Sequence, residues 1–385
     1  MRKIEDFTVK GKRILLRLDL NVPLDKEGNI LDDFRIKAAV PTIKYLREKG
    51  AKVIIISHLG RPEGERKEIY SLRNVAARLK KLVGERIVFL SDCIGKQVEE
   101  QVSKMDEKEI FLLENLRFYK GEKGNSLEFA ERLARLGDIY VNDAFSVSHR
   151  EHTSVTGLPK IMPRAAGLLL QKEIAALSSI RRESMKPLVV IMGGKKSAKL
   201  ESLAKFLEIA DFVLLNGYLA ENVLTSKGLL VRESLLSEEM VKMFRNIDIT
   251  DPKLHLPKDA VFSLRDDWTY KRIGGLGTVR KEEEIFDLGP ETISLFSSII
   301  QNAGSIVWAG PMGAFEAERF QKGTEKIGDK VTRNFKAFKV AGGGDTILAL
   351  KKFGWLDKID HVSTGGSAML DFLCDEELIG VESLK

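Results

Sequence analysis

The chain has 385 residues, more than one hydrophobic core usually organises, so we expect two domains. Hydrophobic residues make up 43% and charged residues 31% of it, the balance of a soluble globular protein. The net charge of +6 is too small to predict nucleic-acid binding, and neither an aromatic-interleaved basic patch nor a zinc-ligand spacing is present. A local cluster of basic residues that binds a small acidic substrate is the better interpretation.

The two cysteines, Cys93 and Cys374, lie far apart in the sequence. This usage predicts a reducing compartment and no disulfide framework. The N-terminus lacks the apolar core of a signal peptide, and no apolar run reaches membrane-spanning length. We therefore expect a cytoplasmic protein that binds neither nucleic acid nor membrane.

Short apolar runs alternate with helical patterns through the first half of the chain. Unbroken apolar strands separated by helices predict a parallel sheet that is covered on both faces. The expected strands are 14–16, 53–56, 87–90, 110–113 and 139–141, and the expected helices are 36–48, 71–82 and 126–136. In such sheets, ligands bind beyond the carboxyl ends of the strands.

Basic side chains follow four of these five strands. They are Arg17, His58, Arg61, Arg117 and Arg150, and Arg35 stands just before the first expected helix. A single arginine of this kind is more often a solvated surface charge. Four strand ends that each bring a basic side chain to the same edge are harder to explain as solvated surface charges. Arginine binds phosphate or carboxylate through a planar, two-pronged guanidinium. The edge therefore predicts a site for a small, multiply charged anion.

The runs RLDLNVP, SHLGRP, LLENLRF and NDAFSVSHR, in this order, resemble the phosphoglycerate kinase family, and the resemblance extends over nearly the whole chain. It implies that Arg35 stabilises the phosphoryl group during transfer. It also implies an N-terminal domain, residues 1–163, that binds 3-phosphoglycerate. The substrate-binding residues implied are Asp19, Leu20, Asn21, Arg35, His58, Leu59, Gly60, Arg61, Arg117 and Arg150.

Pro159 and Pro163 interrupt the pattern, and a helix follows them. By resemblance this segment, 164–180, links two domains. Strand–helix alternation then resumes, with expected strands 188–192, 212–215, 260–264, 305–308 and 337–341. We expect two doubly wound, Rossmann-like parallel-sheet α/β domains joined by the interdomain helix and a hinge. The second, 181–365, would bind nucleotide, and the tail, 366–385, would pack back on the first.

The first strand of the second half ends in a Gly-Gly turn followed by lysines at 195, 196 and 199. The turn lacks the upstream glycine of a Walker A loop, so we reject that motif. Lysines at a helix start oppose the helix dipole unless an anion binds there. By resemblance, Lys196 follows the transferred phosphoryl group and Lys199 binds the nucleotide phosphates.

A glycine loop, 342–346, lies between an apolar strand and a helical pattern. Glycines let backbone N–H groups approach an anion, and the helix dipole favours negative charge there. The alternative is a tight turn in which Asp345 and Thr346 only cap the helix. The resemblance favours a phosphate loop with Asp345 on Mg²⁺, and a second glycine turn at 363–367 that faces the reaction centre. It implies catalytic roles for Arg35, Lys196, Gly343 and Gly366, and nucleotide binding by Gly194, Lys199, Pro311, Glu316 (ribose), Gly343, Gly344, Asp345 and Thr346.

The sequence departs from the family mainly in this half. Lys195 stands where the family usually has Ala, Ala309 replaces an Asn, Ser367 replaces a Gly, and 216–219 replaces a glycine-rich turn near the adenine. We therefore expect altered base recognition.

The activity implied is reversible phosphoryl transfer between 1,3-bisphosphoglycerate and Mg-ADP, giving 3-phosphoglycerate and Mg-ATP. The two sites would lie on different domains, so we expect hinge closure in a monomer. One alternative is a non-catalytic anion-binding scaffold of the same fold. A dinucleotide-dependent oxidoreductase is disfavoured because no G-x-G-x-x-G opens the first βα unit.

Overall fold

The computed structural model describes residues 1–195, 197–230, 237–375 and 377–385. The chain divides into two compact units: Met1–Ala175 together with Glu377–Lys385, and Ala176–Glu376. The division falls within the long helix α7 (Leu168–Glu183). We had expected a returning tail from residue 366. Residues 377–385 belong to the first unit, whereas α14 (Gly366–Asp375) belongs to the second.

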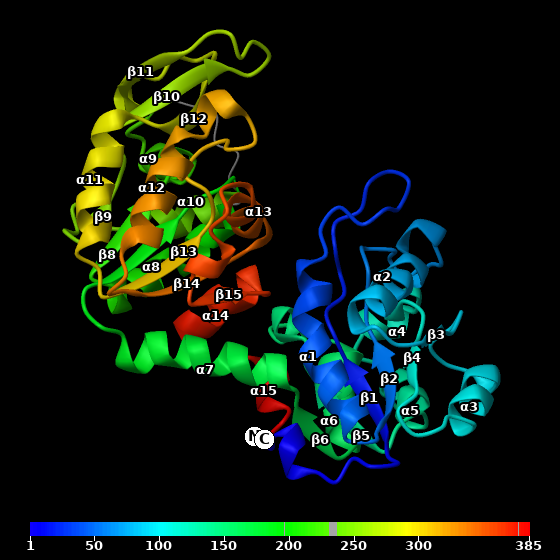
Figure 1. Ribbon diagram of the computed structural model, residues 1–385. Helices are drawn as coiled ribbons and strands as arrows, with labels where there is room; N and C mark the ends of the chain where they lie inside the picture. The colour runs from blue at the N-terminus through cyan, green and yellow to red at the C-terminus, as the bar shows by residue number, and fades with distance from the viewer. Residues whose placement is uncertain (196, 231–236, 376) are drawn as a thin grey trace. The chain divides into compact units, whose positions relative to one another are not determined.

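The first unit contains a six-stranded parallel sheet in the order β3-β4-β2-β1-β5-β6 (Figure 1). Both faces of its central strands are buried. Ile14 and Ile55 pack in one core with Ile43, whereas Leu15 and Ile54, on the opposite face, are also fully buried. This explains the unbroken apolar runs. The strands are β1 (Arg13–Arg17), β2 (Lys52–Ile56), β3 (Ile87–Phe89), β4 (Ile110–Leu112), β5 (Ile139–Asn142) and β6 (Arg164–Ala166).

Helices α1 and α2 pack together on this sheet (Figure 1). Helix α1 begins at Phe34, so Arg35 lies in its first turn rather than before the helix as expected. Strand β6 was not predicted, because an arginine and two alanines form no apolar run. The helices are α1 (Phe34–Glu48), α2 (Arg73–Val83), α3 (Lys96–Ser103), α4 (Lys120–Lys123), α5 (Leu127–Ala134), α6 (Leu158–Ile161) and α15 (Ile379–Glu382).

The second unit contains another six-stranded parallel sheet, in the order β15-β14-β13-β7-β8-β9. Its core joins Ile306 and Trp308 to Phe296 of α11 and Ile327 of α12. The strands are β7 (Leu188–Met192), β8 (Phe212–Leu215), β9 (Leu254–His255), β13 (Ser305–Ala309), β14 (Phe338–Gly342) and β15 (His361–Ser363). The remaining helices are α8 (Leu203–Ile209), α9 (Gly217–Ser226), α10 (Glu238–Arg245), α11 (Pro290–Gln301), α12 (Lys322–Arg333) and α13 (Gly344–Lys352).

The prediction that 260–264 joins this parallel sheet was wrong. The segment forms β10 (Asp259–Leu264), the centre of a separate antiparallel sheet with β11 (Arg272–Gly275) and β12 (Glu283–Leu288). The connection from β10 to β11 is short enough for a hairpin, whereas parallel neighbours need a crossover of a dozen or more residues. An apolar run alone does not distinguish the two cases.

Candidate functional site

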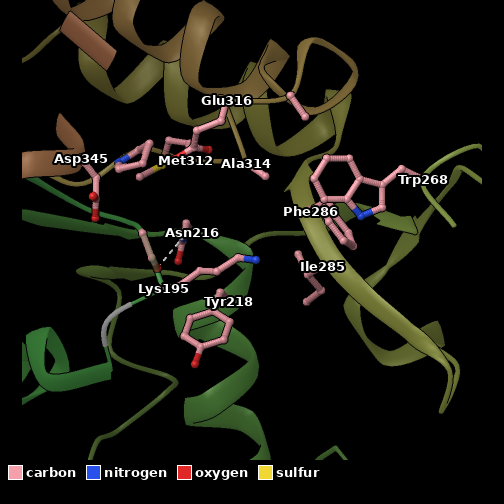
Figure 2. A pocket seen from close by; sticks show the side chains of 14 residues that line it. Lys195, Asn216, Tyr218, Trp268, Ile285, Phe286, Met312, Ala314, Glu316 and Asp345 are labelled. Carbon is pink, nitrogen blue, oxygen red and sulfur yellow. Dashed lines mark hydrogen bonds between the residues drawn. The ribbon is translucent and has the colours of Figure 1, made fainter. Parts of the chain in front are cut away.

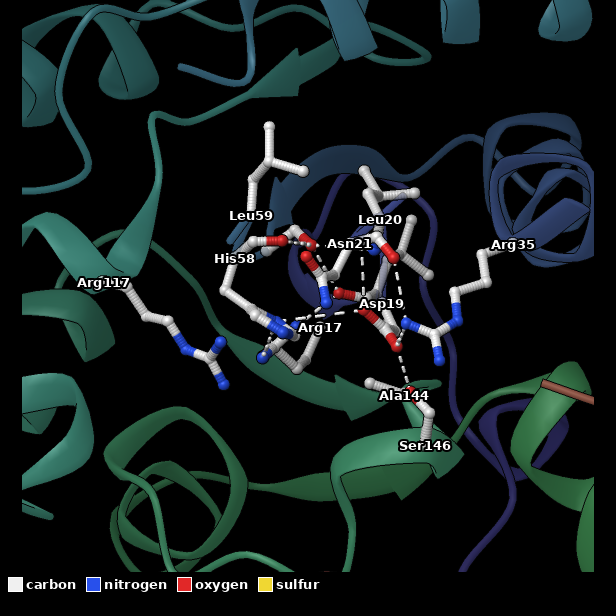
Figure 3. Close-up of polar contacts among 12 residues, drawn as sticks. Arg17, Asp19, Leu20, Asn21, Arg35, His58, Leu59, Arg117, Ala144 and Ser146 are labelled. Carbon is white, nitrogen blue, oxygen red and sulfur yellow. Dashed lines mark hydrogen bonds and ion pairs between the residues drawn. The ribbon is translucent and has the colours of Figure 1, made fainter. Parts of the chain in front are cut away.

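The carboxyl ends of β1, β2, β4 and β5 meet at one edge of the first sheet, because these strands are parallel and adjacent. The residues after each strand, with the first turn of α1, bring the predicted basic side chains to this edge. Figure 3 shows Arg35, His58 and Arg117 there, and the charges of Arg35 and Arg61 act on Arg150. We call Arg35, His58, Arg61, Arg117 and Arg150 the basic edge.

Arg35 is held by the segment after β1. Its Nη1 atom lies 2.9 Å from Oδ2 of Asp19 and donates to the carbonyl oxygen of Asn21 at 2.9 Å. Asp19 is buried and also accepts hydrogen bonds from the hydroxyl of Ser146 and, at 3.0 Å, from the N–H of Asn21. The amide oxygen of Asn21 accepts from the N–H of Gly60 at 2.8 Å. These contacts connect the ends of β1, β2 and β5 to the start of α1.

His58 is fully buried and neutral. Burial lowers the pKa of His58 well below its usual value, and the positive charges of Arg17 and Arg117 lower it further. Nδ1 of His58 lies 3.0 Å from Nη2 of Arg17. Because arginine can only donate, Nδ1 must accept and Nε2 must carry the hydrogen. His58 therefore presents a fixed N–H donor.

Arg17 holds His58, and each of its three guanidinium nitrogens has a partner within the described residues. Its Nε donates to the hydroxyl of Ser154 at 2.8 Å, and its Nη1 donates to the carbonyl oxygen of Leu18. Ser154 in turn donates to the buried carboxylate of Glu122 at 2.6 Å. Glu122 and Ser154 were not found by sequence reasoning, since a polar residue in a short helix or turn carries no signal of burial.

Arg117 differs from Arg17 in its hydrogen bonding. Arg117 is only 3% exposed. Its Nη1 donates to the carbonyl oxygen of Gly60 at 2.7 Å, but its Nε and Nη2 have no hydrogen-bond partner within the described residues. Burial, together with the charges of Arg17 and Arg150, lowers the pKa of Arg117 to about 10. A buried cation with unused donors is costly unless an anion binds it.

Asn115, which sequence reasoning also missed, aligns the loops around Arg117. Its side-chain amide donates to the carbonyl oxygen of Leu59 at 2.7 Å, and its oxygen accepts from the N–H of Arg117 at 3.0 Å. Gly60 has φ +63°, and a Cβ there would lie 2.3 Å from the ring of Tyr70. Glycine is therefore required at this position.

Arg150 and Arg61 complete the basic edge with different exposure. Nε of Arg150 donates to Nε2 of His149 at 3.1 Å, and burial lowers the pKa of Arg150. Arg61 is exposed. The structure thus assembles the predicted residues at one edge: Asp19, Leu20, Asn21, Arg35, His58, Leu59, Gly60, Arg61, Arg117 and Arg150.

The ends of β7 and β13 in the second unit approach each other very closely. The N–H of Gly193 donates to the carbonyl oxygen of Ala309 at 3.0 Å, and that of Gly194 donates to the carbonyl oxygen of Pro311 at 2.8 Å. Nζ of Lys199 joins both strand ends, donating to the carbonyl oxygens of Gly193 at 2.8 Å and Ala309 at 3.0 Å. Lys196, predicted to be catalytic, lies outside the described residues.

Two glycine turns meet at the ends of β14 and β15. Gly343 is the N-cap of α13 with φ +103°, and a Cβ on Gly366 would lie 2.8 Å from its Cα. The starts of α13 and α14 are therefore adjacent, and their N–H groups form a site that suits an anion. Asp345 lies in the first turn of α13. The buried hydroxyl of Thr346 donates to the carbonyl oxygen of Gly342 at 2.8 Å, a bond within the turn.

A pocket of about 390 Å³ extends between these turns and the antiparallel sheet (Figure 2). Asp345 and Trp268 lie at opposite ends of it in this view. Asn216, the N-cap of α9, donates through Nδ2 to the carbonyl oxygen of Gly194 at 3.2 Å. The remaining lining residues are Gly194, Lys195, Tyr218, Ile285, Phe286, Pro311, Met312, Gly313, Ala314, Glu316 and Ala317.

The comparisons with known proteins agree with each other. A family model described as phosphoglycerate kinase matches residues 4–376. The phosphoglycerate kinase of Dictyoglomus turgidum is 42% identical over 99% of this chain and 98% of its own length. Among solved structures, phosphoglycerate kinase from Pyrococcus horikoshii has a TM-score of 0.87 at 33% identity, covering 100% of this chain and 98% of that one. The corresponding structure from Coxiella burnetii has a TM-score of 0.82 at 35% identity, covering 99% and 98%. None of these findings supports the non-catalytic scaffold.

Within the described part of the chain, no helix is both long and apolar enough to cross a membrane.

Proposed function

The chain belongs to the phosphoglycerate kinase family, and on this premise we propose which of its groups carry the reaction. The enzyme is a phosphotransferase that moves a phosphoryl group reversibly between 1,3-bisphosphoglycerate and ADP, giving 3-phosphoglycerate and ATP. Such transfer needs little covalent chemistry from the protein. It needs alignment of the reacting atoms and neutralisation of charge.

The basic edge of the first unit binds 3-phosphoglycerate in this proposal. The observation that carries it is Arg117, a buried guanidinium with two donors that the described protein leaves unused. A phosphate or carboxylate would satisfy both donors at once. Around it, the N–H of His58 and the guanidinium groups of Arg150, Arg61 and Arg35 supply further donors, and Asp19 and Asn21 hold Arg35 in place. Leu20, Leu59 and Gly60 contribute the backbone of the two loops.

Arg35 neutralises the charge on the transferring group. The two glycine turns of the second unit, which adjoin each other at Gly343 and Gly366, would offer backbone N–H donors to the same group when the substrates meet. We keep Lys196 in the proposal from the family resemblance alone. No general base is needed, because the acceptor is a carboxylate that is already ionised at neutral pH.

The second-unit pocket binds the nucleotide. Gly194, Pro311, Glu316 and Asp345 line it. In this proposal Gly194, Pro311 and Asp345 meet the phosphates and Glu316 binds the ribose. We assign Lys199, Gly343, Gly344 and Thr346 to the phosphates from the family resemblance. The described residues hold no cluster of three or more metal-ligating side chains. Asp345 by itself fits Mg²⁺, which commonly takes one or two carboxylates together with phosphate and water oxygens. When bound, the ion would neutralise phosphate charge.

Hinge closure follows from the placement of the two sites on separate units, because transfer requires both substrates in contact and water excluded. We expect small-angle scattering to show a smaller radius of gyration with 3-phosphoglycerate and a non-hydrolysable nucleotide bound together than with either alone. An unchanged radius would contradict closure.

We also propose a monomeric, cytoplasmic enzyme. Both cysteines are free, as expected in a reducing compartment.

The test is a coupled assay of purified protein with 3-phosphoglycerate, Mg²⁺ and ATP, following 1,3-bisphosphoglycerate. Turnover that disappears with EDTA and returns with Mg²⁺ is expected. Tight 3-phosphoglycerate binding without turnover on any triphosphate would contradict the proposal.

A further inference from the structure

One end of the second-unit pocket is built to receive a flat ring. Trp268 meets Phe286 edge-on with ring centroids 5.8 Å apart, and Phe286 in turn packs on Phe320 at 4.7 Å. Ile285 lines the pocket beside them, and Tyr218 lines it from α9, below Lys195 in Figure 2. Aromatic and apolar walls of this kind suit a nucleobase. The opposite end, with Gly194 and Asp345, suits phosphates, so a nucleotide has one favoured direction in the pocket.

Lys195 reaches the ring end. It follows Gly194 after β7, and its Nζ lies 5.5 Å from the centroid of the Phe286 ring. Figure 2 shows its side chain extending away from Asp345, toward Ile285 and Phe286. It is the one cation among the described residues that line this pocket.

Two other side-chain donors of the pocket already have partners. Nε1 of Trp268 donates to the carbonyl oxygen of Arg265 at 3.1 Å, and Nδ2 of Asn216 donates to the carbonyl oxygen of Gly194 at 3.2 Å. The ammonium of Lys195 is therefore the charged donor best placed to meet the edge of a bound base.

We infer that Lys195 sets the base preference, favouring a purine with a carbonyl group at position 6 over adenine. An ammonium donates hydrogen bonds and accepts none. Guanine and hypoxanthine present O6 and N7 as adjacent acceptors, whereas adenine presents an amino donor beside N7. An adenine amino group next to the ammonium would place donor against donor. The inference rests on the function proposed above and names the substrate class of its nucleotide pocket.

The experiment measures kcat/KM for ATP, GTP and ITP with the intact enzyme and with Lys195→Met, which keeps the length of the side chain and removes its charge. ITP has O6 but lacks the exocyclic amino group of guanine, so it isolates the carbonyl edge. The intact enzyme is expected to use GTP and ITP at least as well as ATP. Lys195→Met should lower kcat/KM about tenfold for GTP and ITP, mainly through KM, and leave ATP unchanged or improved.

Lys271→Met is the matched control, because Lys271 also lies over an aromatic ring, Phe320, at 5.9 Å but does not line the pocket. It should leave all three nucleotides unaffected. With Lys195→Met, an equal loss of kcat/KM for the three nucleotides would overturn the inference and make Lys195 a phosphate contact. Unchanged kcat/KM for all three would also overturn the inference. In either case turnover with ATP would leave the proposed function standing, whereas absence of turnover with every triphosphate would reject that function itself.

Discussion

The guanidinium of Arg35 lies 2.9 Å from the carboxylate of Asp19, and Asp19 is itself held by Ser146 and the N–H of Asn21. Asp19 is buried, so this ion pair is shielded from water on one side. The charge of Arg35 is thus positioned before any substrate arrives. A charge that needs no rearrangement can stabilise a transition state more than a ground state.

We predict that Arg35→Ala lowers kcat about 100-fold or more while weakening 3-phosphoglycerate binding much less, because the charge acts mainly during transfer. Steady-state kinetics and calorimetric titration measure the two effects. Arg47→Ala on the same helix, where Arg47 pairs with Glu85 at 2.9 Å, should leave both unchanged. Equal losses of rate and affinity for Arg35→Ala would make it a ground-state anchor.

The two buried arginines Arg17 and Arg117 should respond in opposite ways to the same substitution. Arg117→Met removes a cation with two unused donors, so we expect unchanged or higher stability without ligand, and 3-phosphoglycerate binding weakened by about 100-fold. Arg17→Met removes three hydrogen-bonding contacts and leaves Nδ1 of His58 without its donor, so we expect a loss of about 2–4 kcal/mol of stability. Thermal unfolding with and without 3-phosphoglycerate tests both. A strongly destabilised Arg117→Met would show that Arg117 is a structural residue.

Gly366→Ala should disturb the phosphate turns without unfolding the protein. Its Cβ would lie 2.8 Å from the Cα of Gly343, closer than such atoms approach, so the two turns must move apart. Because misplaced donors weaken transition-state stabilisation, we expect kcat to fall by about tenfold or more. Gly277→Ala is the control, since nothing lies within 4 Å of its Cβ position. Wild-type kcat in Gly366→Ala would remove these turns from the mechanism.

The stability of the first unit should decrease as the pH falls below about 6.5. Burial lowers the pKa of His149 to about 4 and of His152 to about 3. Between these values and the ordinary histidine pKa, the unfolded chain binds protons that the folded chain does not, so acid favours unfolding. His149→Gln, which keeps an acceptor for Arg150, should reduce this pH dependence by up to about 1.4 kcal/mol per pH unit.

Urea denaturation between pH 5 and 7, followed by far-ultraviolet circular dichroism, measures the effect. Tryptophan fluorescence provides an internal control, because Trp268, Trp308 and Trp355 all lie in the second unit. The fluorescence transition should keep its pH dependence in His149→Gln. An unaltered dichroism transition would contradict the prediction.

Much of the fold could be predicted because its signals are local. An apolar run between helical patterns predicts a buried strand, and all ten strands expected in this way exist, nine of them in a parallel sheet. Strand β6 and the antiparallel placement of β10 could not be predicted, because both depend on which neighbour is available for pairing. The basic edge was predictable for a topological reason, since parallel adjacent strands bring their carboxyl ends together.

The difference between Arg17 and Arg117 illustrates what only the tertiary structure decided. Arg17 is the last residue of β1 and Arg117 lies in the turn after β4, and nothing in the neighbouring residues distinguishes their roles. Ser154 and His58, distant in sequence, satisfy Arg17, whereas Arg117 reaches the same region with two donors unused. The amino-acid sequence by itself determined the strands, the glycine turns and the kinds of charge present. Folding determined which charges are buried and already paired, because burial and hydrogen bonding arise from segments that meet only in three dimensions.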